Sequence, residues 1–423
     1  MIGLFGGTCN NMYVFAKVLA DNNYSIRFIE DRGENFPHSQ PVWDDVDVCF
    51  ESGFDYQQIV WTEFEAQHNW QPMSWYFRPE KIRGGEQRIF ELSRLSFPIK
   101  YLACRYLRTC PEALSVYNAM MECDFLIVCG IKASILAMLT GKPYMIFPHG
   151  SDMRIAIGAE LKGKGVKGKV VDWLVTRSFQ SASLIGSSLP DASAEVSKEE
   201  YRRLRDLKVE RLPLPYVSEP RLPDAERRNK LIELFNGFEI PLPEKQFYCF
   251  SPSRINFHWK GHDRLLRAIS NNRQHIDIHF IFLGWGDDYV EAMEYVTEND
   301  LSEFVTVLPF FLSKQYLFRF FKSVDFILDE LNGSGSYGTS LSEAISVGCP
   351  VVTWISDMFD QPGWLAPPVI QARTETQLGQ TMLSISSGEI DLSSCSSSVV
   401  EWFYKVHDCT AVLPVLDQKI SEA

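Results

Sequence analysis

Apolar residues in the first half of the chain come in short continuous runs that alternate with segments of helical spacing. The runs that we predict to be strands are Ile2–Phe5, Ser25–Ile29, Asp124–Cys129 and Tyr144–Phe147, and the segments that we predict to be helices are Asn11–Leu19 and Ala133–Leu139. Continuous apolar strands separated by helices are typical of a parallel sheet that is covered on both faces.

The second half repeats this design more clearly. Its predicted strands are Phe247–Phe250, Ile278–Leu283, Val305–Pro309, Asp325–Leu328 and Pro350–Trp354, and its predicted helices are Asp263–Ser270, Lys314–Lys322 and Ser340–Val347. Such alternation gives a doubly wound α/β domain. The predicted fold class is therefore α/β, with two Rossmann-like doubly wound domains.

The chain has 423 residues, which is the length of two domains of about 200 residues each. Prolines between Leu212 and Pro223 favour an extended linker, with a hinge near 213–222. We expect an N-terminal domain at 1–215 and a C-terminal domain at 216–398. Residues 399–423 would form an aromatic helix and a tail that cross back to the first domain.

Composition and charge argue against several classes of protein. Apolar residues make up 45% and charged residues 22%, as in an ordinary globular protein. No apolar run is long enough to span a membrane, and the first residues lack a signal-peptide pattern. The net charge of −13 argues against general nucleic-acid binding. Ten scattered cysteines without a C-x-x-C pair predict a reduced, cytoplasmic protein.

Two segments of the second half suit a phosphate-bearing ligand. Arg254 and Lys260 flank a loop that leads from a strand into a helix, where free N–H groups and cations would meet a diphosphate. The glycine-rich run 333–338 joins a strand to a second helix, in which Glu343 could accept hydrogen bonds from a ribose. The alternatives are solvated loop cations and an ordinary acid at a helix start.

The order of these pieces resembles the retaining GT-B glycosyltransferases, family 4 in particular. The pieces are Lys260-Gly261, Gly284-Trp285-Gly286, Tyr337-Gly338, Glu343-Ala344 and Gly348-Cys349-Pro350-Val351-Val352. The resemblance covers about Ser251–Trp354. It implies two domains that face each other across a cleft, an acceptor-binding domain at 1–215 and a nucleotide-sugar-binding (donor) domain at 216–398. It also implies transfer of a sugar from a nucleotide-diphosphate sugar with retention.

The resemblance also implies roles for individual residues. Arg254 and Lys260 would hold the donor diphosphate, Glu343 the ribose, and the backbone of Gly338, Thr339 and Ser340 the phosphate or sugar oxygens. The base would lie at Leu308–Phe311, including Pro309 and Phe310. Fixed cations would stabilise the leaving group without a metal ion, and no cofactor is expected beyond the donor itself.

The first half supplies candidates for the opposite side of the cleft. Gly6 and Gly7 follow the first strand, and the resemblance places them beneath the donor phosphates; the alternative is a generic tight turn. His149 follows another strand and resembles the cleft histidine of the family, whereas a lone histidine is otherwise more often structural. Asp152 would orient the acceptor.

One departure from the family pattern concerns the sugar. The family often has two glutamates with seven residues between them, and the first touches the transferred sugar. The position that matches the first glutamate is Gly335. Two metal-site alternatives are the D-x-D of Asp45 and Asp47 and the pair His258 and His262, for which no third ligand is evident.

Two segments suggest a membrane surface. Basic residues gather in 154–177, and the segment 90–107 mixes aromatic and aliphatic residues with Arg94, Lys100 and Arg105. Such an amphipathic stretch fits either a core helix with solvated charges or contact with anionic lipid at the inner face of the membrane.

The function that we expect is a metal-independent, retaining glycosyltransferase with a nucleotide-sugar donor and a glycan or glycolipid acceptor. Two alternatives stay open: a nucleotide-sugar epimerase on the same scaffold, and a catalytically weak sugar-nucleotide-binding protein, which Gly335 would explain.

Overall fold

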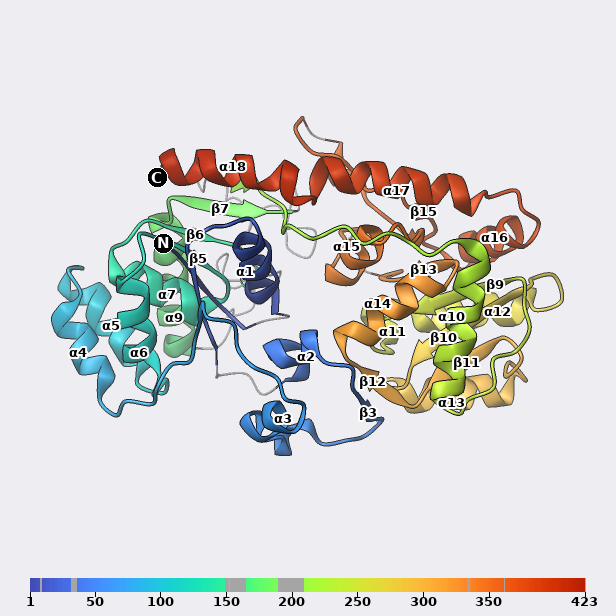
Figure 1. Ribbon diagram of the computed structural model, residues 1–423, viewed down its shortest axis with the longest axis horizontal. Coiled ribbons are helices and arrows are strands. Elements are labelled where there is room, and N and C mark those ends of the chain that lie inside the picture. The colour runs from blue at the N-terminus through green and yellow to red at the C-terminus, as the bar shows by residue number, and fades with distance from the viewer. Residues whose placement is uncertain are drawn as a thin grey trace. The chain divides into compact units, whose positions relative to one another are not determined.

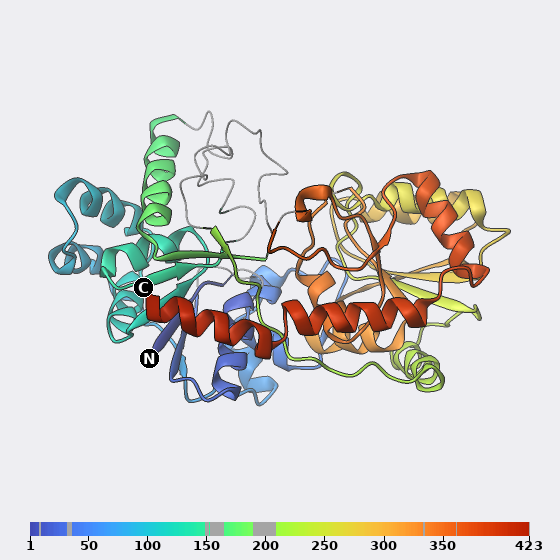
Figure 2. The same cartoon turned by 90° about the horizontal axis from the view of Figure 1, so that it is seen from above.

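The computed structural model describes residues 1–7, 10–31, 36–148, 152, 165–188, 209–332, 335–360 and 362–422 (Figures 1 and 2). The chain divides into two compact units. Unit 1 comprises Met1–Trp43, Tyr56–Tyr216 and Cys409–Ala423, and unit 2 comprises Asp44–Asp55 and Val217–Asp408. In the described residues, no helix is long and apolar enough to cross a membrane.

Unit 1 is built on a seven-stranded sheet in which every strand pair is parallel. In spatial order its strands are β4 (Tyr76–Phe77), β2 (Ile26–Ile29), β1 (Ile2–Phe5), β5 (Phe125–Val128), β6 (Tyr144–Ile146), β7 (Leu184–Ser187) and β8 (Val209–Arg211). Ile2 of β1 is in register with Ile26 on one side and with Phe125 on the other. Both β1 and β5 are buried along their whole length, as their continuous apolar sequences predict.

Unit 1 also contains helices. They are α1 (Asn11–Asp21), α3 (Trp61–Gln67), α4 (Gly85–Leu92), α5 (Phe97–Leu107), α6 (Ala113–Met121), α7 (Ile131–Thr140), α9 (Gly165–Ser181) and α18 (Cys409–Glu422). The core joins α6, α7 and α9 to the central strands. Helix α7 follows β5 and ends at Gly141, which adopts the left-handed conformation that commonly stops a helix.

Unit 2 has a six-stranded sheet, again parallel at every pair. In spatial order its strands are β11 (Val305–Leu308), β10 (Ile278–Leu283), β9 (Phe247–Ser251), β13 (Phe326–Leu328), β14 (Val351–Thr353) and β15 (Ile370–Gln371). The helices are α10 (Asp224–Gly237), α11 (Phe257–Lys260), α12 (His262–Asn272), α13 (Tyr289–Glu298), α14 (Lys314–Ser323), α15 (Thr339–Ser346), α16 (Glu375–Ser386) and α17 (Leu392–Val406).

The packing of these helices forms two layers around the second sheet. Helix α12 contacts α13 and α16, whereas α14 contacts α10 and α15. The prediction of two Rossmann-like α/β domains is confirmed. Because all strands of a sheet run in one direction, their carboxyl ends meet at one edge, which is where ligands bind in such folds.

A short segment of the first part of the chain belongs to unit 2. Helix α2 (Pro41–Asp45) leads into β3 (Cys49–Glu51), which pairs antiparallel with β12 (Phe310–Leu312). The Ser52 N–H also donates to the Pro309 carbonyl over 2.8 Å. Residues 44–55 thus extend the structure that follows β11.

Candidate functional site

The loop after β9 is held from both sides at the carboxyl edge of the second sheet. Ile255 N–H donates to the carbonyl of Trp285, 2.7 Å away, in the loop that follows β10. Asn256 caps α11, because its side-chain oxygen accepts from the N–H of Trp259 over 2.6 Å. Between these anchors, the side chain of Arg254 is exposed to solvent. The loop therefore presents a cation from a fixed backbone.

Lys260 ends α11 and points at the carboxyl end of β13. Its Nζ lies 2.6 Å from Glu330 Oε1 and 3.3 Å from Asp329 Oδ1. Burial by itself lowers the pKa of Lys260, but the two carboxylates outweigh it and raise the pKa to about 12. Lys260 is therefore a permanent cation whose charge is already shared by two acids, a feature that the sequence did not predict.

The start of α15 lies next to this ion pair. A Cβ on Gly338, the residue before α15, would lie 3.8 Å from Glu330 Oε1, so the backbone there approaches the partner of Lys260 closely. The next residues, Thr339 and Ser340, are half-buried in the first turn. N–H groups in a first turn have no acceptor within their own helix. The structure thus brings Lys260 and the predicted backbone donors together.

Glu343 lies one turn into α15 and is only 2% exposed. It forms an ion pair with Lys314, the first residue of α14. A carboxylate in such a place is stable only because a cation neutralises it. Lys314 is a site residue that the sequence did not indicate, because it lies far from Glu343 along the chain.

Gly335, at the position that matches the first glutamate of the resembled pattern, has no room for a side chain. Gly335 has a φ of +76°, and an added Cβ would lie 2.6 Å from Trp354 Cη2 and 2.6 Å from Ser356 Cβ. The guanidinium of Arg373 lies over the Trp354 ring, 3.9 Å from its centroid. The indole of Trp354 therefore fills the space beside Gly335.

The segment Leu308–Phe311, which we predicted to hold the base, is fixed by contacts with other parts of unit 2. Pro309 accepts a hydrogen bond from Ser52, and the ring of Phe310 packs against Phe238 with centroids 5.0 Å apart. The next residue, Phe311, instead packs on Trp285 with centroids 4.8 Å apart. Alternation along β12 therefore directs Phe311, and not Phe310, toward the loop after β10.

The candidates of unit 1 lie at the carboxyl edge of the first sheet or outside the described residues. Gly6 has a φ of +144°, and a Cβ there would lie 2.2 Å from the Cys129 carbonyl, so close packing against β5 explains this glycine. The adjacent Gly7 lies against Asp31, which is ion-paired with Lys132. Asp152 is buried. His149 lies outside the described residues.

The two metal-site alternatives have other roles in the structure. Asp47 forms an ion pair with Arg319 of α14. The buried His262 lies with Nε2 3.1 Å from Ser251 Oγ, and burial lowers its pKa to about 4. His258 is exposed at the surface. No group of three or more His, Cys, Asp or Glu suited to a metal ion occurs among the residues that the structure describes.

A comparison with protein families finds a match within unit 2. Residues 235–359 match the family of glycosyl transferases group 1. This group 1 match contains the Arg254 loop, Lys260, the Lys314–Glu343 pair and the start of α15. No curated protein sequence matches the chain.

Solved structures extend the likeness to the whole chain. The structure of Alr3699/HepE from Anabaena in complex with UDP and glucose is 13% identical, with a TM-score of 0.61 over 100% of this chain and 99% of that one. The lipopolysaccharide outer core galactosyltransferase WaaB is 11% identical, with a TM-score of 0.53 over 100% and 99%. A glycosyltransferase from Rickettsia africae ESF-5 is 13% identical, with a TM-score of 0.51 over 100% and 97%. The fold is therefore that of GT-B glycosyltransferases.

Proposed function

We propose that this protein transfers a sugar from a nucleoside-diphosphate sugar to a glycan or lipid-linked acceptor, with retention at the anomeric carbon. The observation that carries the proposal is the position of Lys260, held beside the N-terminus of α15 inside the group 1 match. A half-buried permanent cation next to the N–H groups of a first helical turn suits a diphosphate.

The proposed reaction replaces one bond to the anomeric carbon with another. The bond from that carbon to the donor phosphate breaks, and the acceptor hydroxyl oxygen forms the new bond on the same face. The departing phosphate takes the hydroxyl proton. Negative charge grows on the phosphate oxygens as the bond breaks, and Arg254, Lys260 and the first turn of α15 would stabilise it without a metal ion.

Asp329 and Glu330, the two acids that pair with Lys260, weaken its attraction for a diphosphate. A diphosphate that approaches Nζ must share the cation with Asp329 and Glu330, which repel the ligand. Glu330 is the more exposed of the two acids, and its oxygen is the closer one to Nζ. We infer that Glu330 turns away when the donor binds, whereas the buried Asp329 keeps Lys260 in place.

An anionic membrane surface is part of the proposal for the acceptor side. On α5, Phe97 is 64% exposed and Tyr101 46% exposed, and their rings stack with centroids 5.9 Å apart. The exposed Arg94 and Arg105 flank these rings. Exposed aromatic rings beside basic residues favour the boundary of an anionic membrane, where a lipid-linked acceptor would be held.

The test compares UDP, which is bound in the Alr3699/HepE structure, with uridine. By calorimetry we expect Lys260→Gln to weaken UDP binding about 100-fold and uridine binding little, because only UDP carries the diphosphate. Equal losses for both ligands would refute the role of Lys260. Lys322→Gln removes a lysine of α14 that pairs with Glu219 instead and serves as the control.

Incubation with UDP-glucose alone distinguishes a transferase from an epimerase and from a protein that only binds the donor. An epimerase would change the sugar of UDP-glucose without an acceptor, whereas a transferase needs one. A protein that only binds the donor would produce neither an epimer nor a glycosylated acceptor. The anomeric configuration of the product, read by NMR, tests retention.

A further inference from the structure

The glycine-rich run that leads into α15 contains one large side chain. The sequence of 333–338 is Gly-Ser-Gly-Ser-Tyr-Gly, so Tyr337 is the one residue there whose side chain can pack extensively. Glycine loses more conformational freedom on folding than any other residue, and a run of this kind therefore needs contacts from elsewhere to keep one conformation. The contacts of Tyr337 are the main side-chain restraint on the backbone that enters α15.

Tyr337 is only 7% exposed and lies in a cluster of aromatic rings. Its ring stacks on Phe359, with centroids 5.6 Å apart, and meets Trp402 of α17 edge to face, with centroids 5.7 Å apart. Trp402 is fixed in turn, because its Nε1 donates to the Leu365 carbonyl over 3.1 Å. Stacked and edge-to-face pairs are both favourable arrangements of aromatic rings. Phe359 and Trp402 therefore hold the Tyr337 ring from two directions.

His407 holds the hydroxyl of Tyr337. Its Nε2 lies 3.3 Å from Tyr337 Oη, and the histidine is only 1% exposed. The His407 N–H donates to the Phe403 carbonyl over 2.8 Å, which fixes it to the last turn of α17. A buried tyrosine hydroxyl needs a hydrogen-bond partner. The end of α17 thus holds the tip of a ring whose backbone leads into α15.

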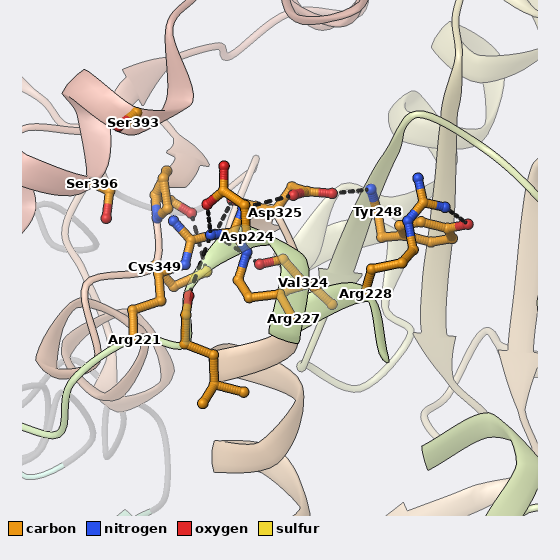
Figure 3. Close-up of polar contacts among 12 residues, drawn as sticks. Arg221, Asp224, Arg227, Arg228, Tyr248, Val324, Asp325, Cys349, Ser393 and Ser396 are labelled. Carbon is orange, nitrogen blue, oxygen red and sulfur yellow. Dashed lines mark hydrogen bonds and ion pairs between the residues drawn. The ribbon is translucent and has the colours of Figure 1, made fainter. Parts of the chain in front are cut away.

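The far end of α15 has an anchor of its own. The carbonyl of Ser346, its last residue, accepts from the Glu219 N–H over 3.1 Å. Arg221 fixes this segment to the start of β13, because its Nη2 donates to the Val324 carbonyl over 2.7 Å (Figure 3). Loss of a contact at Tyr337 would therefore loosen the first turn of α15 and leave the rest of the helix in place.

We propose that Tyr337 and His407 are positioning residues for the donor diphosphate, an inference that rests on the proposed function. They do not touch the ligand. The ring and its hydrogen bond fix the backbone at Gly338, so the N–H groups of the first turn of α15 keep one direction. Donors that are fixed before the ligand arrives bind an anion more tightly, because the loop does not have to be ordered on binding.

The nucleoside part of the donor should depend little on this contact. Glu343, the expected partner of the ribose, is ion-paired with Lys314 and lies one turn further along α15. The predicted base segment is fixed separately, because the Pro309 carbonyl accepts from the Ser52 N–H. A change at Tyr337 should therefore weaken diphosphate binding more than nucleoside binding, whereas a general destabilisation would weaken both alike.

Calorimetry of the full chain with UDP and with uridine tests this inference. Tyr337→Phe keeps the ring and removes the hydroxyl, and it should weaken UDP binding about fivefold and uridine binding little. Tyr337→Ala also removes the ring contacts and should weaken UDP binding about 30-fold. The matched control is Tyr248→Phe, because Tyr248 is another buried tyrosine of unit 2 whose hydroxyl is hydrogen-bonded, in this case to Arg228 (Figure 3). It should leave UDP binding unchanged.

A double-mutant cycle tests whether His407 acts through Tyr337. His407→Phe keeps a ring and removes the hydrogen-bonding nitrogen, so it should weaken UDP binding by a factor similar to that of Tyr337→Phe. The double variant should lose little more than either single variant, because both remove the same hydrogen bond. Fully additive losses would overturn the proposed action of His407 through Tyr337.

The results also separate this inference from the proposed function. UDP affinity that Lys260→Gln reduces and Tyr337→Phe leaves unchanged would overturn the role of Tyr337 and retain the donor site. Equal losses of UDP and uridine affinity in Tyr337→Phe would also overturn it, and this variant keeps its ring contacts even if Tyr337→Ala fails to fold. If the unsubstituted protein bound no nucleoside diphosphate, the proposed function and this inference would both be overturned.

Discussion

The indole of Trp354 occupies the space that a side chain at residue 335 would need. A Cβ on Gly335 would lie 2.6 Å from Cη2 and 2.7 Å from Cζ3 of the ring. Gly335 also accepts a hydrogen bond from the Ser356 N–H over 2.9 Å, which fixes the backbone at this point. The absence of a side chain at Gly335 therefore leaves room for the indole of Trp354.

We expect Gly335→Ala to destabilise the protein by about 3 kcal/mol, because it adds overlap with Trp354 to the cost of a left-handed backbone. Gly388→Ala is the matched control: Gly388 has the same φ of +76°, but nothing lies within 4 Å of its Cβ, so only about 1 kcal/mol is expected. Urea denaturation measures both. In the background of Trp354→Ala, Gly335→Ala should cost less than in the unsubstituted protein but more than the control, because the overlap with Ser356 Cβ remains.

The buried pair of Lys314 and Glu343 predicts a strong non-additive effect. Lys314→Met should destabilise the protein by about 3 kcal/mol, since it leaves a buried carboxylate without its cation. The double variant Lys314→Met with Glu343→Gln should recover a large part of this loss. A double-mutant cycle of urea denaturation gives the coupling energy, and purely additive losses would show that the two groups do not interact.

His279 predicts a loss of stability in acid. Burial lowers its pKa from 6.5 to about 4, so the unfolded chain binds a proton below pH 6.5 that the folded chain does not bind until about pH 4. Stability should therefore fall as pH decreases from 6.5 to 4, by up to about 3 kcal/mol from this residue. His279→Gln should make the profile less steep but not flat, because the pKa of the buried His262 is lowered in the same way, whereas His275→Gln, at an exposed position, should leave the slope unchanged.

The rings exposed on α5 predict binding to anionic vesicles. The double variant Phe97→Ser with Tyr101→Ser should weaken binding to vesicles that contain phosphatidylglycerol about tenfold, because the aromatic contact with the membrane boundary is lost. Val290→Ser changes an equally exposed apolar residue of unit 2 and serves as the control. Cosedimentation measures both. Equal binding of all three proteins would contradict a membrane role for α5.

The strands that position the site could be predicted from sequence, because a buried parallel strand is a continuous apolar run. Ile278–Leu283 illustrates this: all six residues are buried, and the predicted and observed bounds agree. The helix that contains Val399–Val406 begins earlier, at Leu392, because its first turns are rich in serine and lack an apolar pattern. Local sequence patterns therefore predict that a helix or strand is present better than they predict the residues at which it begins and ends.

The contacts within the site could not be predicted, because they depend on packing. Lys314 reaches Glu343 only through the contact of α14 with α15, and Trp354 reaches Gly335 from a different strand end. The direction of Phe311 follows from the pairing of β12 with β3, a strand that lies more than 250 residues earlier. No local pattern contains such information.

Residues 44–55 belong to unit 2 although they lie between two segments of unit 1, and this affects the design of chimeric proteins. The chain passes from one unit to the other after Trp43, Asp55, Tyr216 and Asp408, so neither unit is a single stretch of sequence. A chimera that exchanges the second half of the chain with that of a relative by one cut in the middle would leave β12 without its partner strand. A graft of unit 2 should therefore carry Asp44–Asp55 together with Val217–Asp408.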